Sequence, residues 1–101
     1  MFLHSVYFWM KPDLDADGVK AFERGLQTLC LDTPANSGHF GKPAGTDRDV
    51  VDNSYGYGLF LVFDDAAGHD AYQVGEVHQQ FIADHGTKWE HVLVYDTQFS
   101  L

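Results

Sequence analysis

Tyr72 and His78 are the two residues of this sequence whose types and spacing best suit proton transfer. They stand in the stretch AYQVGEVHQQF, from Ala71 to Phe81, on either side of a glycine. An imidazole with one ring nitrogen hydrogen-bonded keeps the other free as a base near neutral pH, and a phenol can donate a hydrogen bond to a ligand. The pair can work in this way only if both side chains face one space inside the fold.

The helical pattern around His78 predicts that its side chain points inward. His78, Phe81, Ile82 and His85 lie at positions i, i+3, i+4 and i+7 of one helix, and residues at this spacing share a face. His78 therefore belongs to the inward stripe, near the start of that helix.

A glycine break is expected to bring Tyr72 toward the same space. Tyr72 lies near the end of a short preceding helix, and Gly75 bends the chain before the next one begins. His4 on the first strand and Asp96 on the last strand are expected to face this space as well. In that arrangement Asp96 supplies the carboxylate that holds one ring nitrogen of His78.

A structural interpretation competes with the catalytic one. Aromatic residues on inward helix faces usually pack in cores, so His78 can equally be a buried histidine held by a carbonyl, and Tyr72 a packing ring. An open cavity against His78 favours ligand binding, whereas a filled core favours a purely structural role.

The elements that must position these residues begin with four strands. Segments Phe2 to Met10 and Tyr55 to Asp64 are rich in aromatic and β-branched residues and carry apolar side chains on both faces. A less regular strand is expected within residues 36–45, then a charged loop over residues 46–54, and a last strand from His91 to Phe99.

Helices are expected between the strands. Asp13 or Asp15 can cap a helix with an apolar stripe that ends near Pro34, and two shorter helices are expected over residues 65–74 and 76–85. The resulting order, β-α-β-β-α-β, predicts an α+β, ferredoxin-like fold in which helices cover one face of an antiparallel sheet.

The sheet face without helices is predicted to be apolar. Its expected side chains are Leu3, Tyr7, Trp9, Phe60, Val62, Leu93 and Tyr95. Because a monomer of this size rarely exposes such a surface, we expect two sheets to pack face to face in a homodimer, forming a dimeric α+β barrel.

Composition restricts the setting and the partners. The 101 residues suit one domain, spanning 1–101, and the net charge of −9 opposes binding to nucleic acid or to anionic membranes. The apolar start ends at Lys11-Pro12 and is interpreted as a strand, not as a signal peptide or membrane span. Cys30 is the single cysteine, which suits a reducing, cytoplasmic setting.

Motifs for metals and cofactors are weak in this sequence. Of its six histidines, His78 and His85 lie two helical turns apart, and no local metal-binding motif accompanies them. The glycines at 38, 41 and 45 match neither a dinucleotide-binding fingerprint nor a phosphate loop. No metal site and no cofactor are predicted.

Four segments together resemble the stress-responsive dimeric α+β barrel (Dabb) family: FLHSVYFWMKP, YGYGLFLVF, AYQVGEVHQQF and WEHVLVYD. Members of that family are similar to olivetolic acid cyclase, a plant polyketide cyclase with a pocket between sheet and helices. The resemblance implies a base at His78, a tyrosine at Tyr72, a pocket histidine at His4, and Asp96 close to the base.

The resemblance also marks differences from the cyclase. Tyr57 stands where the cyclase has another pocket histidine, Leu26 stands where it has a tyrosine, and Gly75-Glu76 replaces the common His-Pro. The predicted catalytic pair is His78 and Tyr72, and the predicted pocket residues are His4, Leu26, Tyr57, Phe81 and Asp96. The implied function is a cytoplasmic homodimer that holds a small aromatic or polyketide-like ligand; the alternative is a non-catalytic dimeric stress protein.

Overall fold

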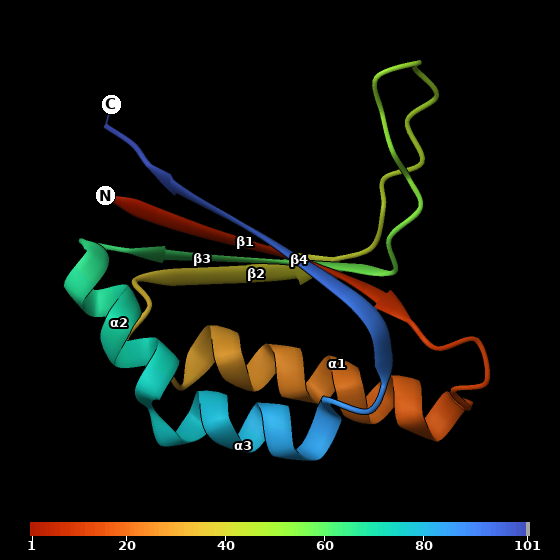
Figure 1. Cartoon of the computed structure of the whole chain (residues 1–101), viewed down its shortest axis with the longest axis horizontal. Coiled ribbons are helices and arrows are strands. Elements are labelled where there is room, and N and C mark those ends of the chain that lie inside the picture. The colour runs from red at the N-terminus through yellow and green to blue at the C-terminus, as the bar shows by residue number, and fades with distance from the viewer. Residues whose placement is uncertain (101) are drawn as a thin grey trace.

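A computed structural model describes residues 1–100, which form a four-stranded antiparallel sheet with helices on one face (Figure 1). The strands are β1 (Phe2–Met10), β2 (Ser37–Gly41), β3 (Tyr57–Phe63) and β4 (Trp89–Gln98), and the helices are α1 (Ala16–Leu31), α2 (Ala66–Val74) and α3 (Glu76–His85). This arrangement confirms the predicted α+β, ferredoxin-like fold. None of the helices in residues 1–100 has both the length and the apolar character needed to cross a lipid bilayer.

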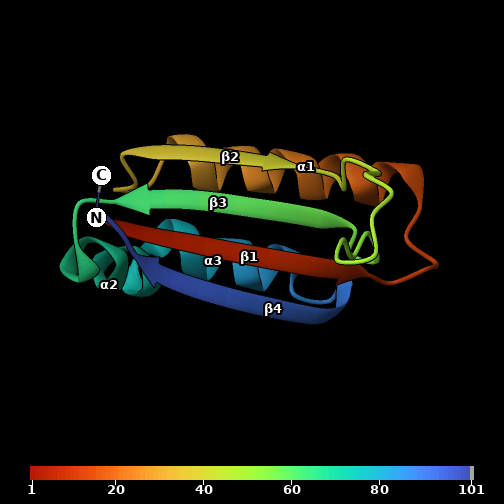
Figure 2. The same cartoon turned by 90° about the horizontal axis from the view of Figure 1, so that it is seen from above.

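The strand order in the sheet is β2-β3-β1-β4, so the first strand is central and the last is an edge strand (Figure 2). β1 pairs antiparallel with β3 and β4, and His4 stands opposite Leu61 on one side and Asp96 on the other. Residues paired directly across two strands point to the same face of the sheet. The register therefore places His4 and Asp96 side by side on the face that the helices cover.

The core lies between this face and the helices. Phe22, Leu26 and Leu29 follow three- and four-residue spacing along α1 and are almost completely buried. The ring of Phe8 on β1 lies 5.2 Å from that of Phe22 and 6.2 Å from that of Phe81 on α3, measured between centroids. Burying one side chain of this kind contributes about 1.5–3 kcal/mol, so this layer holds both helices on the sheet.

The start of α1 and the break between α2 and α3 follow from local chemistry. Asp15, not Asp13, caps α1, because its Oδ1 accepts a hydrogen bond from the Gly18 backbone N–H at 2.8 Å. Gly75 is extended (φ −72°, ψ 154°), and a Cβ there would lie only 3.2 Å from the Ala71 carbonyl oxygen. The glycine therefore allows α3 to begin immediately after α2 in a new direction.

Most predicted boundaries agree with the structure to within two or three residues. β4 starts at Trp89, two residues earlier than predicted, because Trp89 pairs with Met10 beyond a register shift in the β1–β4 ladder. The pairing with β1 thus extends β4 through residues that the sequence pattern alone leaves outside the strand.

The other face of the sheet is apolar and partly open, as predicted. Tyr7 lies at its centre, with its ring centroid 5.9 Å from Phe60 and 6.4 Å from Tyr95. The side chain of Tyr95 is 59% exposed, and Trp9 is half-buried. The segment 42–56 rises from one end of the sheet on this same side, away from the helices (Figure 1).

Candidate functional site

A cavity of about 220 Å³ lies between the sheet and the helices, against His78. Four of its lining residues are polar: His4, Tyr72, Gln73 and His78. The remaining nine are apolar: Val6, Phe8, Leu29, Leu59, Phe81, Ile82, Trp89, Val92 and Val94. Mostly apolar walls with a few polar groups are typical of small-molecule sites.

The mouth of this cavity lies between α3 and β4. Ile82 on α3 and Val92 and Val94 on β4 are exposed, although they belong to the lining. Because β4 is an edge strand, no further strand within residues 1–100 covers them on that side. A ligand can therefore enter past these three side chains.

The polar end of the cavity is organised around Tyr72. Its ring centroid lies 5.7 Å from that of His4 and 4.9 Å from that of His78, so the phenol ring stands beside both imidazoles. Burial raises the pKa of Tyr72 far above its ordinary value of 10, with a smaller contribution from Cys30. The hydroxyl therefore stays protonated at neutral pH and is able to donate a hydrogen bond.

His78 is half-buried at the start of α3 and lines the cavity. Burial lowers its pKa below 6.5, a hydrogen bond to the Gln73 backbone opposes that shift, and the nearby His69 adds to it. The imidazole is therefore neutral at pH 7, which is the form that accepts a proton.

Asp96 bonds to His4, not to His78 as the sequence analysis expected. The distance from His4 Nδ1 to Asp96 Oδ1 is 2.6 Å, and the two residues are direct partners in the β1–β4 register. Burial lowers the pKa of His4, and the hydrogen bond to Asp96 opposes that effect. Asp96 is therefore the hydrogen-bond partner of His4, whereas the hydrogen bond of His78 is to the backbone of Gln73.

His69 on α2 joins this group, and the sequence analysis missed it. Its Nε2 lies 3.2 Å from His4 Nδ1, and its ring stacks on Phe2 with 4.4 Å between centroids. His69 precedes Tyr72 by three residues on one helix, which was the available signal that both share a face. The sequence motifs predicted no metal site, yet ligand atoms of His4, His69 and Asp96 all lie within 4.8 Å of one another.

Only some of the other predicted pocket residues line the cavity. Phe81 and His4 line the cavity, whereas Leu26, Tyr57 and Asp96 do not belong to its lining. Leu26 is fully buried in the core under α1. The Tyr57 hydroxyl donates a hydrogen bond to Glu23 Oε2 at 2.8 Å, and burial together with that carboxylate raises its pKa to about 12. Tyr57 therefore ties β3 to α1.

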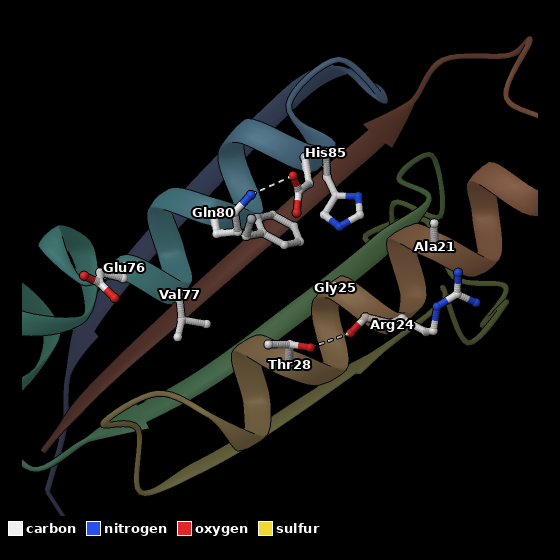
Figure 3. A pocket seen from close by; sticks show the side chains of 10 residues that line it. Ala21, Arg24, Gly25, Thr28, Glu76, Val77, Gln80 and His85 are labelled. Atoms are coloured by element: carbon white, nitrogen blue, oxygen red, sulfur yellow. Dashed lines mark hydrogen bonds between the residues drawn. The ribbon is translucent and has the colours of Figure 1, made fainter.

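A larger groove of about 570 Å³ runs along the outer side of α1 and α3 (Figure 3). Two hydrogen bonds along the groove stay within one helix each: Thr28 Oγ1 donates to the Arg24 carbonyl at 3.0 Å, and Gln80 Nε2 donates to Asp84 Oδ1 at 2.8 Å. His85 Nδ1, at the end of the groove, lies 2.8 Å from Lys88 Nζ. The cavity at His78 is the stronger candidate site despite its smaller volume, because Tyr72 stands beside His4 and His78 at one end of mostly apolar walls.

Sequence comparison identifies the family. The sequence profile of the stress-responsive A/B barrel domain, Dabb, matches residues 2–99. The chain belongs to the stress-responsive A/B barrel family. No curated protein matches this A/B barrel chain in a sequence search.

Solved structures agree with this assignment of the A/B barrel fold. A protein from Arabidopsis thaliana aligns with a TM-score of 0.82 at 17% identity, over 100% of this chain and 97% of its own. A dimeric ferredoxin-like protein of unknown function from Thermobifida fusca gives 0.78 at 18% identity, with 97% and 90% covered. The hydroxynitrile lyase from Passiflora edulis gives 0.81 at 14% identity, with 98% and 93% covered. At these identities the likeness concerns the fold.

The buried histidines predict that acidification destabilises this A/B barrel. Burial lowers the pKa values of His4, His78 and His85 below 6.5, so the unfolded chain binds more protons than the folded chain once the pH falls toward that value. We expect the free energy of unfolding, measured by urea denaturation, to fall between about pH 7.5 and about pH 5.5. His78→Gln should reduce this dependence, and a stability that is constant or rises on acidification would contradict the assignment of neutral buried histidines.

Proposed function

We propose that this protein binds a small aromatic or polyketide-like ligand in the cavity between sheet and helices and transfers a proton, with His78 as general base. The observation that supports this most is the open volume of about 220 Å³ directly against a neutral imidazole. A general base needs this combination of a free lone pair, an unprotonated resting state and room for the reacting group.

In the proposed reaction His78 removes a proton from a hydroxyl group or an activated carbon of the ligand. The imidazole becomes imidazolium, and the electron pair left behind develops as negative charge on a ligand oxygen. In a hydroxynitrile that electron pair forms the carbonyl group while the C–C bond to the nitrile carbon breaks, and the departing cyanide takes the proton from the imidazolium and leaves as hydrogen cyanide. The protonated hydroxyl of Tyr72 donates a hydrogen bond to that oxygen. Since the walls are largely apolar, such a hydrogen bond is stronger here than in water.

The size of the cavity favours a compact ligand. Drug-sized molecules occupy pockets of roughly 300–1,000 Å³, and this cavity is smaller. A single aromatic ring with short substituents suits it better than an extended polyketide chain. The hydroxynitrile lyase among the fold relatives supports proton-transfer chemistry on this scaffold, and an aromatic hydroxynitrile has both the size and the hydroxyl proton that the site requires.

The proposed assembly is a homodimer formed through the apolar sheet faces. The exposed aromatic surface around Tyr7 and Tyr95 supports it, as does the dimeric Thermobifida fusca relative. A cytoplasmic location, which the free Cys30 favours, stays a prediction.

The dimer predicts that a charge on the sheet face disrupts assembly. Phe60→Lys should shift sedimentation of the protein at micromolar concentration from dimer to monomer or aggregate, because a buried lysine in the interface would lack a partner. Val74→Lys replaces an exposed valine on α2, away from the sheet face, and should remain dimeric. A well-behaved wild-type monomer under these conditions would rule the assembly out.

The catalytic assignment predicts how variants act on mandelonitrile, an aromatic hydroxynitrile whose cleavage releases benzaldehyde with a strong ultraviolet absorbance. His78→Ala should lower kcat/KM by about 10²- to 10⁴-fold, and Tyr72→Phe should lower it less while preserving the packing of the ring. The wild-type rate should rise with pH through a midpoint below 6.5, because only neutral His78 accepts a proton.

A matched control for this assay is His39→Ala, which removes an exposed histidine on β2. Its rate should equal that of the wild type. The proposed proton transfer from a hydroxynitrile would be contradicted if the wild type released no benzaldehyde, or if His78→Ala released it as fast as the wild type.

A further inference from the structure

We propose that His4, His69 and Asp96 form a binding site for a divalent transition-metal ion, with Zn²⁺ as the occupant. The three side chains come from β1, α2 and β4, and their ligand atoms all lie within 4.8 Å of one another. Two imidazoles and a carboxylate form a donor set that zinc accepts, with a fourth position left for water.

One of the three pairs of ligand atoms already has the spacing of a tetrahedral site, and the pair formed by Asp96 and His69 lies within 4.8 Å. Zinc bonds of about 2.0–2.1 Å place tetrahedral ligands about 3.3 Å apart. His4 Nδ1 and His69 Nε2 already stand at 3.2 Å. Asp96 Oδ1 lies 2.6 Å from His4 Nδ1 and would have to withdraw by roughly 0.7 Å to reach the tetrahedral spacing. Its side chain is 38% exposed on the edge strand, which leaves room for this movement, and the bond to the ion would replace the hydrogen bond to His4.

Proton accounting also favours a cation at this point. His4 Nδ1 carries at most one hydrogen, yet it faces both the Asp96 carboxylate and His69 Nε2 at hydrogen-bonding distance. That nitrogen cannot donate a hydrogen bond to Asp96 and also accept one from His69, and a single hydrogen shared by two acceptors satisfies neither fully. A metal ion between the three atoms would engage all three lone pairs, with the ring hydrogen of His4 on Nε2 and no net gain or loss of protons by the neutral ring.

The surroundings hold both imidazoles in place. The His69 ring stacks on Phe2, and its Nδ1 lies 3.8 Å from Asp70 Oδ1, on the side away from the cluster. At 3.8 Å this contact is too long for a hydrogen bond, so the stacking on Phe2 is what orients the His69 ring. The His4 ring packs edge-on against Tyr72. Both histidines are therefore buried and oriented before an ion arrives.

The test is isothermal titration of ZnCl₂ into the untagged, full-length protein after dialysis against EDTA. We expect one ion bound per chain, and at least about tenfold weaker binding in His69→Gln and in Asp96→Asn. The control His39→Gln should bind as the wild type does. Because Asp96 is exposed, Asp96→Asn keeps the test decisive even if His69→Gln folds poorly.

Cobalt(II) provides a spectroscopic readout of the same site. Co²⁺ bound in place of zinc should give the intense visible bands of tetrahedral coordination, and these should disappear in His69→Gln and Asp96→Asn. The proposal would be overturned if zinc showed no saturable binding up to millimolar concentration, or if both variants bound zinc with unchanged affinity. It would also be overturned if cobalt gave only the weak bands of an octahedral complex. Neither readout involves a substrate, so the outcome is independent of the proposed proton transfer by His78.

Discussion

The central strand β1 is paired on both sides, and its register with the edge strand β4 decides which polar groups meet in this protein. That register places His4 opposite Asp96 and aligns Val6 and Phe8 with Val94 and Val92. On the helix-covered face of these two strands, the end with His4 and Asp96 is consequently polar, and the part with the valines and Phe8 is apolar. A shift of one residue would turn every one of these side chains to the other face of the sheet, so the site exists only in this pairing.

The helices complete the site by covering only part of this face. α1 packs against β2 and is hydrogen-bonded to β3 through Glu23 and Tyr57, whereas the side toward β4 is left open and the cavity lies between α3 and β4. The break at Gly75 lets α2 present Tyr72 and α3 present His78 to the same space. Burial then sets the protonation states: the His78 imidazole is held neutral and the Tyr72 phenol is held protonated. Burial of these side chains lowers the stability of the fold in acid. At neutral pH the same burial leaves His78 as a base and Tyr72 as a hydrogen-bond donor.

Sequence periodicity was sufficient for the fold and for part of the site. The three- and four-residue spacing of α3 predicted that His78 and Phe81 face inward, and both line the cavity. Periodicity specifies which face a residue occupies, but it does not specify its neighbour on another element. For that reason Asp96 was paired with the wrong histidine, and His69 was missed. Leu26 and Tyr57 lie on the helix-covered side as expected, yet outside the cavity, because α1 packs tightly over that part of the sheet.

The central claim, that His78 and Tyr72 meet a small molecule in the cavity, is tested most directly by a crystal structure with orcinol, a phenol with one ring and two hydroxyl groups. We expect its ring between α3 and β4, with one hydroxyl about 2.6–3.2 Å from His78 or Tyr72. Orcinol bound only in the groove between α1 and α3, or absent from the cavity at saturating concentration, would contradict the claim.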